Sequence, residues 1–454
     1  LFATNSSLVT AKEYKTIPTD ETKNFTIRHK KGDYTFGSAN ANKEELAWMK
    51  QFNIVEIGGV DDKDVTKKLL KSNGLNTIKY HIAYDWMPAF YYYLDSQNRP
   101  FVNWLYKNKE RATLNPKGPF LHCKENHYDW CEDYYYNFED KETFEKRVDD
   151  LTTQLKTKGF NGVFFDWASG EHIYEERFKT HLDNFKRLNP NKEYLQSVAN
   201  YYKKLKDSGL FIVTNQAFRE PTYLLAFVDY DMTESYITTD IKKKIKLQLD
   251  NRGWVEEVAL TNYFPIYEDS TSIIDSLEYI DLLDSYKKKY AKNGFKNFIY
   301  LNYLAPEYER VYESSLIYRA IKPTNAIYFS YAMAKLSNSM VYAEVSNYRT
   351  LERDDIYFYD LGKPLEKSYA KLNAIKGYIR FYEHGFVLVS EAYKNQKYLK
   401  INSLYLPKIV KVFDAYNHSW LQVAQHQVSI KLDFSTENFS NKHLPLGRVF
   451  LYAE

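Results

Sequence analysis

The sequence predicts an α/β protein: a (β/α)8 (TIM) barrel followed by a C-terminal antiparallel β-sandwich domain. From Leu46 to about Ala334, short apolar runs alternate with amphipathic helical patterns, as expected for βα units around a parallel sheet. From about Val341 the helical patterns stop, and short alternating strands separated by turn residues follow, which is typical of a sandwich. The expected domains are an N-terminal extension (residues 1–45), the barrel (46–340) and the sandwich (341–454).

Eight apolar runs are the expected barrel strands, and a strand around residues 35–38 is expected to open the fold. The eight lie near Ile54–Gly58, Thr77–Ala83, Pro119–Cys123, Gly162–Asp166, Leu210–Asn215, Tyr230–Glu234, Val258–Asn262 and Phe298–Asn302. The helical patterns between them include Lys141–Lys158, Lys192–Ser208 and Ser272–Asn293. Helix-stopping glycines precede several strands, namely Gly74, Gly159, Gly209 and Gly294.

The sandwich is predicted from strands that alternate in polarity and are bounded by turn residues. The clearest are Gly377–Phe381, Gly385–Val389, Ile409–Phe413 and Arg448–Tyr452.

The stretch Gly159–Trp167 is the most informative part of the chain. It reads as a buried strand that ends in one carboxylate, with Phe164 and Asp166 on one face and Val163 and Phe165 on the other. Later strands repeat the pattern of an apolar run with a polar residue at its carboxyl end. Polar groups at the carboxyl ends of successive parallel strands are how a barrel builds an active site.

Two of these strand-end residues, Asp166 and Glu234, are the expected catalytic pair. Hydrolysis of a glycosidic bond needs one carboxyl group that protonates the leaving oxygen and a second that attacks the anomeric carbon or activates water. Asp166 is assigned as the nucleophile and Glu234 as the general acid/base. The structural alternative for each is a helix N-cap or an ion-paired residue at the rim.

Further strand-end residues are expected to bind the substrate. Amides donate and accept hydrogen bonds, and tyrosine and tryptophan offer a flat apolar face to a sugar ring. The candidates are Asp85, Trp86, Trp167, Asn215, Tyr236, Asn262 and Asn302. The alternatives are Asx turns for the asparagines and loop anchors for the aromatic residues.

Charge and motifs exclude several other classes. Lys and Arg number 62 and Asp and Glu 59, a net charge of +3, so nothing indicates a nucleic-acid or acidic-membrane partner. The runs Lys242–Lys244 and Lys287–Lys289 are expected to be solvated helix faces. No P-loop, dinucleotide-binding or nucleophile-elbow motif occurs, and His122, His127 and His172 are scattered, so no cofactor and no metal are expected. No apolar run is long enough to span a membrane, and no feature indicates an oligomeric state.

The cysteines and the first residue bear on localisation. Cys123 and Cys131 are the only two cysteines, and their spacing allows either a loop disulfide or two free thiols. The chain starts at Leu1 and not at Met, which predicts removal of an N-terminal piece, either a cleaved signal peptide or a truncation of the expressed chain. An exported protein (periplasmic, cell-surface or extracellular) is expected.

Three segments resemble a set of bacterial glycoside hydrolases that combine a barrel with a C-terminal β-domain. Gly159–Trp167 is similar to their G-[FY]-[DN]-G-[VI]-F-x-D strand four, with Asn161-Gly162 where Asp-Gly is usual. The other two are Tyr359–Pro364 and Tyr378–Val389, the latter similar to an R-x-[FY]-x-x-G-x-V-L-V hairpin. The resemblance covers about residues 75 to 400. It implies a barrel with a strand-four aspartate, here Asp166, and Glu234 fits the strand-six acid by position only.

The leading hypothesis is a glycoside hydrolase that cleaves a polysaccharide or oligosaccharide by a retaining two-carboxylate mechanism. The second is a catalytically silent carbohydrate-binding or surface-assembly protein on the same fold, and the third is a sugar-transferring enzyme. A distance between the two carboxyl groups of about 5–5.5 Å supports retention, and about 6.5–9.5 Å supports inversion. A much larger gap, or a mouth blocked by side chains, favours the binding protein, and product analysis with an acceptor sugar identifies a sugar-transferring enzyme. We also expect an acidic cleft lined by aromatic residues at the carboxyl rim.

Overall fold

The computed structural model describes most of the chain. The described residues of the 454 are 26–37, 41–59, 80–85, 90–92, 100–114, 133–166, 168, 171–219, 222–234, 239–248, 255–264, 271–304, 306–314, 316–345, 349–391, 398–408, 410–433 and 445–453. The chain divides into two compact units. One comprises Tyr34–Thr233 and Ser285–Phe298, and the other comprises Leu1–Asp33, Glu234–Asp284 and Ile299–Glu454.

The largest sheet has eight strands and is the sheet of a barrel, as the sequence predicts. Its hydrogen-bonded order is β1 (Gly32–Gly37), β2 (Phe52–Gly59), β3 (Tyr80–Asp85), β6 (Gly162–Phe165), β7 (Phe211–Asn215), β8 (Tyr230–Glu234), β11 (Asn297–Leu304) and β14 (Met340–Val345). The pairs β2/β3, β3/β6, β6/β7, β7/β8 and β11/β14 are parallel. The expected opening strand is confirmed as β1.

Helices connect the strands, as βα units require. Those described are α1 (Lys43–Met49), α3 (Pro100–Lys107), α4 (Lys109–Ala112), α6 (Lys141–Lys158), α7 (Lys179–Leu188), α8 (Tyr194–Asp207), α9 (Thr271–Tyr290) and α10 (Thr324–Leu336). Short 3-10 turns are η3 (Glu171–Tyr174), η4 (Glu176–Phe178), η5 (Thr222–Phe227), η6 (Ala291–Asn293), η7 (Arg349–Leu351) and η8 (Asp355–Phe358), and a two-stranded ribbon joins β4 (Phe90–Tyr92) to β5 (Asp133–Tyr135).

Helix α6 shows how local sequence sets these elements. The side chain of Asp140 caps its start by accepting the backbone N–H of Thr143 at 2.9 Å. Gly159 ends it in the left-handed conformation, with φ 81°. Strand β6 begins three residues later, at Gly162, so the end of α6 sets where this strand starts.

One expected barrel strand, Pro119–Cys123, lies outside the described residues, and β3 pairs directly with β6. Two further expectations need correction. Val258–Asn262 is a strand but not a barrel strand, because it belongs to β10 (Val255–Phe264), which pairs antiparallel with β9 (Thr239–Gln248). The eighth barrel strand is β14, which begins at the predicted boundary between barrel and sandwich.

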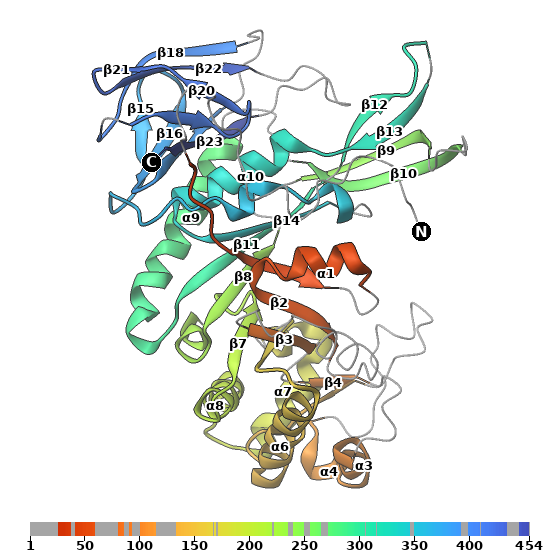
Figure 1. Cartoon of the computed structure of the whole chain (residues 1–454). Coiled ribbons are helices and arrows are strands. Elements are labelled where there is room, and N and C mark those ends of the chain that lie inside the picture. Colours follow the sequence, from red (N-terminus) through yellow and green to blue (C-terminus); the bar gives the residue numbers. More distant parts are fainter. Residues whose placement is uncertain are drawn as a thin grey trace. The chain divides into compact units, whose positions relative to one another are not determined.

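Strands β9 and β10 form a four-stranded sheet with β13 (Ile317–Ile321) and β12 (Glu307–Arg310), in the order β10-β9-β13-β12. The sheet consists of two hairpins, one in the connection that follows β8 and one in the connection that follows β11 (Figure 1). Only a short connection separates β9 from β10, which favours antiparallel pairing over a crossover. Lys242–Lys244 therefore lies in a strand and not on the expected helix face, whereas Lys287–Lys289 lies at the end of α9.

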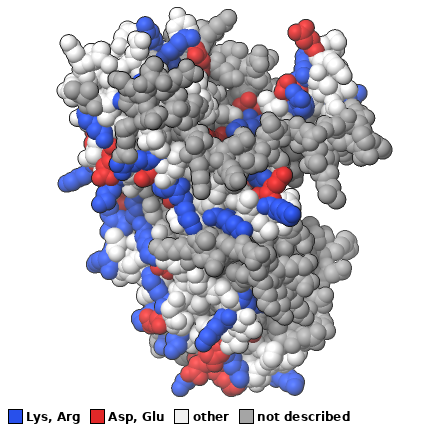
Figure 2. Space-filling view, viewed as in Figure 1, with Lys and Arg blue, Asp and Glu red and all other residues white. Residues whose placement is uncertain are grey.

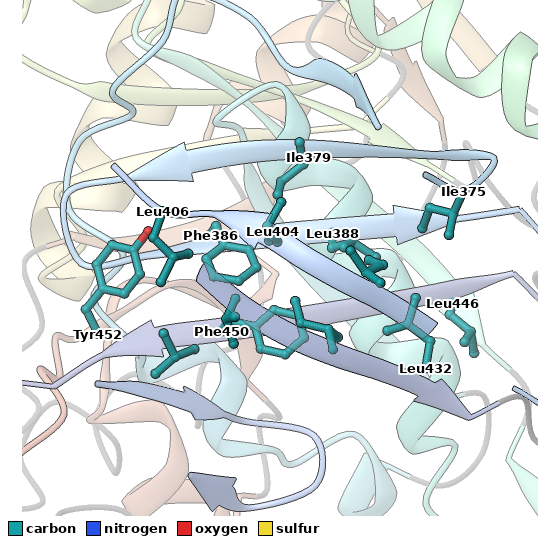
Figure 3. Packing of buried hydrophobic residues seen from close by; sticks show 14 residues of the cluster. Ile375, Ile379, Phe386, Leu388, Leu404, Leu406, Leu432, Leu446, Phe450 and Tyr452 are labelled. Carbon is teal, nitrogen blue, oxygen red and sulfur yellow. The ribbon is translucent and has the colours of Figure 1, made fainter. Parts of the chain in front are cut away.

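The C-terminal region is a β-sandwich, as predicted. One sheet has the order β15 (Ala370–Leu372), β16 (Gly377–Tyr382), β17 (Gly385–Ser390), β23 (Leu446–Tyr452), β19 (Val412–Asp414) and β20 (Ser419–Leu421). The other has the order β18 (Tyr398–Tyr405), β22 (Gln427–Asp433) and β21 (Val423–Ala424). Side chains from both sheets meet in one apolar core, where Phe386 and Phe450 stack with ring centroids 4.7 Å apart (Figure 3).

The surface carries charges of both signs. Figure 2 shows acidic and basic side chains interspersed over the described part of the face in view. Within the described ranges, no helix has both the length and the apolar character needed to cross a membrane.

Two glycines of the barrel give a paired test of the fold. Alanine at Gly162 in β6 would overlap the backbone carbonyl oxygen of Phe211 in β7 and approach Ile82 Cγ2 to 2.9 Å. Gly209 has open space around it, but its φ of +88° strains any other residue. We expect Gly162→Ala to lower the free energy of unfolding by about 3 kcal/mol and Gly209→Ala by about 1 kcal/mol. Urea unfolding measures both, and equal losses would contradict the close packing of β6 against β7.

Candidate active site

The first strand-end pair is Asp166 and Asn215. Asp166 directly follows β6, and Asn215 is the last residue of β7, the next strand in the sheet. The register pairs Phe165 with Thr214, so the two following residues lie level with each other. The Asn215 Nδ2 group donates a hydrogen bond of 2.8 Å to Asp166 Oδ1. The structure thus brings together two of the residues that the sequence places at the carboxyl edge.

The face on which this pair lies follows from the neighbouring side chains. The ring of Phe165 stacks on Tyr202 of α8, with centroids 5.4 Å apart, so this face of β6 is covered by the helix. Successive side chains of a strand alternate in direction. Asp166 therefore lies on the opposite face of the sheet, away from α8, and is partly exposed, while Asn215 is only 8% exposed.

Asp231 on β8 holds the turn that follows Asn215. It is fully buried and lies level with Thr214, whose hydroxyl donates to Asp231 Oδ1 at 2.7 Å. The backbone N–H groups of Ala217 and Phe218 donate to Oδ1 and Oδ2 at 2.9 and 3.0 Å. Burial raises the pKa of Asp231 to about 7, although these donors act in the opposite direction. Asp231 thus fixes the residues that follow Asn215, a role that was not expected from the sequence.

The second strand-end pair is Glu234 and Tyr303. Glu234 is the last residue of β8, and Tyr303 lies near the end of β11. The Tyr303 hydroxyl donates a hydrogen bond of 3.2 Å to Glu234 Oε1. Because Glu234 is three residues after Asp231, the two carboxyl groups of β8 point to opposite faces of the sheet. Asn302 is the candidate expected from the sequence on this strand, and Tyr303, its neighbour on the other face, was not among the candidates.

Asn302 occupies the face of β11 that is turned towards α10. Its side chain is fully buried, and Nδ2 donates to Ser330 Oγ of α10 at 2.7 Å. Tyr300, two residues earlier, receives a 3.4 Å hydrogen bond from Ser337 just after the same helix. This contact of Asn302 joins the strand to its helix, and the substrate-binding role expected from the sequence stays a prediction. Asn302 points towards α10 because side chains alternate along the strand, and the next residue, Tyr303, therefore points to the opposite face.

The structure says little about the remaining substrate-binding candidates. Asp85 is the last residue of β3, and nothing is described of its side chain. Asn262 lies in β10, which pairs antiparallel with β9 in the four-stranded sheet, and hence outside the barrel. Trp86, Trp167 and Tyr236 lie outside the described residues. In the described ranges, no group of three His, Cys, Asp or Glu side chains is arranged to hold a metal ion.

Comparison with known proteins gives remote structural likenesses. No protein-family model and no curated protein matches the chain. Among solved structures, the glycoside hydrolase domain of PelA from Pseudomonas aeruginosa is similar at 12% identity and a TM-score of 0.39, over 71% of this chain and 96% of that chain. An α-amylase from Malbranchea cinnamomea has 9% identity and a TM-score of 0.47, over 93% and 96%. The maltogenic α-amylase AmyB from Thermotoga neapolitana has 12% identity and a TM-score of 0.45, over 92% and 97%.

These neighbours are glycoside hydrolases. The strand order and the parallel strand pairs of the chain itself, and not these likenesses, define the barrel.

The raised pKa of Asp231 predicts a pH dependence of stability. A carboxyl group whose pKa rises on folding binds more protons in the folded than in the unfolded chain between its two pKa values. The free energy of unfolding should therefore fall as the pH rises from about 4 to about 7, by up to about 4 kcal/mol from this group. Asp231→Asn should flatten this slope in urea titrations, even though it lowers stability at every pH. Asp207→Asn, at an exposed helix position, is the control and should leave the slope unchanged.

Proposed function

We propose that the chain is a glycoside hydrolase that cleaves a polysaccharide or oligosaccharide with retention of configuration. Asp166 is the nucleophile and Glu234 is the general acid/base. The observation that carries the proposal is the hydrogen bond from Asn215 to Asp166 at the carboxyl ends of adjacent barrel strands. An amide donor orients a carboxylate and leaves it charged, as attack on a carbon centre requires.

The proposed reaction has two steps. In the first, an Asp166 oxygen attacks the anomeric carbon, the bond to the leaving oxygen breaks, and Glu234 gives its proton to that oxygen. In the second, Glu234 takes a proton from water, and the resulting hydroxide attacks the anomeric carbon and releases Asp166. The Tyr303 hydroxyl, which donates to Glu234 Oε1, supports the second role because it orients the acid and favours its ionised form after proton transfer.

The test of the proposal is hydrolysis itself. The purified chain should release reducing ends from at least one member of a polysaccharide panel, and Asp166→Asn should reduce the rate by on the order of 10³-fold or more. Asp183→Asn, at an exposed position on α7, is the matched control and should retain full activity. Proton NMR of the first anomer released distinguishes retention from inversion.

Full activity of Asp166→Asn would contradict the assignment of the nucleophile. Binding to a polysaccharide without release of reducing ends would instead favour the silent carbohydrate-binding protein. Products longer than the substrate, formed in the presence of an acceptor sugar, would favour a sugar-transferring enzyme.

Tyr303→Phe tests the role of the second pair. The variant keeps the ring and removes only the hydroxyl that donates to Glu234. We expect kcat to fall about tenfold to a hundredfold, the effect of losing one hydrogen bond to a charged group. Steady-state kinetics and thermal melting measure the effect, and an unchanged kcat would contradict a role of Tyr303 in orienting the acid.

A further inference from the structure

The end of β14 places another carboxyl group beside Tyr303. Strands β11 and β14 are parallel, and their register pairs Asn302 with Ala343 and Tyr303 with Glu344. Paired residues of neighbouring strands project from the same face of a sheet. Since Asn302 faces α10, Tyr303 and Glu344 lie on the opposite face, which is the face where Tyr303 reaches Glu234.

The surroundings of Glu344 are charged and largely enclosed. Its side chain is 22% exposed, and Oε1 lies 3.9 Å from Arg349 Nη2 on η7. Glu352 lies next to it, fully enclosed, and accepts hydrogen bonds from the Tyr342 hydroxyl at 2.5 Å and the Val345 N–H at 3.4 Å.

These contacts determine when each group is charged. Burial raises the pKa of Glu344, and Arg349 opposes the rise. Burial also raises the pKa of Glu352 to about 8, and the charge of Glu344 adds to that effect. Glu344 and Glu352 therefore take up negative charge later in a pH titration than exposed carboxyl groups do.

We propose that Glu344 is a positioning residue for Glu234, whose negative charge beside Tyr303 favours the protonated form of the general acid. This inference rests on the proposed function. A general acid must keep its proton until the leaving oxygen takes it, and a neighbouring carboxylate of like charge opposes early loss of that proton. The described groups that face Glu344 are Tyr303 on β11 with Glu234 beyond it, Arg349 on η7, Tyr342 on β14 itself and Glu352.

The test is the pH profile of kcat/KM, whose alkaline limb reports ionisation of the acid. Glu344→Gln removes the charge at nearly constant volume, so the alkaline limb should move towards lower pH by about one unit. Glu344→Asp restores a carboxylate and should bring the limb back towards its original position. A purely structural role would lower the melting temperature and kcat without moving the limb.

A second variant keeps the proposal testable if Glu344→Gln does not fold. Arg349→Met removes the cation beside Glu344 from an exposed position, so the alkaline limb should move towards higher pH, opposite to the shift for Glu344→Gln. Glu309→Gln, on an exposed part of β12, is the control and should leave the profile unchanged.

The two proposals fail in different ways. If Asp166→Asn abolishes hydrolysis but the limb is unmoved in both Glu344→Gln and Arg349→Met, the role of Glu344 is wrong and the proposed function stands. If the unmodified chain hydrolyses no glycan, the proposed function fails first, and the inference about Glu344 fails with it.

Discussion

The two-residue alternation of the barrel strands is the constraint on which the candidate site depends. Each strand end carries polar residues, and alternation assigns each of them to the helix face or to the opposite face. On β6 the stacking of Phe165 on α8 leaves Asp166 for the opposite face. On β11 the bond between Asn302 and α10 leaves that face to Tyr303. A shift of one residue in β6 or β11 would turn Asp166 or Tyr303, respectively, into the helix layer.

Buried polar groups on the helix face of the strands stabilise the backbone next to the candidate site. Asp231 is enclosed and accepts hydrogen bonds from Thr214 and from two backbone N–H groups after β7. A buried carboxylate is costly unless such donors surround it, so its presence fixes the path of the turn. Because that turn directly follows Asn215, the same contacts limit how far the amide beside Asp166 can move.

The connections after β8 and β11 distinguish this barrel from a minimal one. Each contains a hairpin, and the two hairpins join through the parallel pairing of β9 with β13 into one four-stranded sheet. These are the connections that follow Glu234 and Tyr303, the residues of the second strand-end pair. These two connections therefore contain a hydrogen-bonded sheet where a simple barrel would have loops.

The sequence by itself determined the class of fold and most of the strands. Apolar runs, several of them preceded by glycine, located β2, β3, β6, β7, β8 and β11, and loss of helical periodicity located the sandwich, because these signals are local to a few residues. It also placed Asp166 and Asn215 at the carboxyl ends of successive strands, where a barrel gathers its polar groups.

The tertiary structure decided which strands pair and which face each strand-end residue takes. The run at Val258–Asn262 looks like the others, and only its pairing with β9 excludes it from the barrel. Asn302 and Tyr303 are equally plausible ligands in the sequence, and the packing of α10 separates them. Glu344 beside Tyr303 depends on the register of two strands some forty residues apart, a non-local relation that no short stretch of sequence encodes.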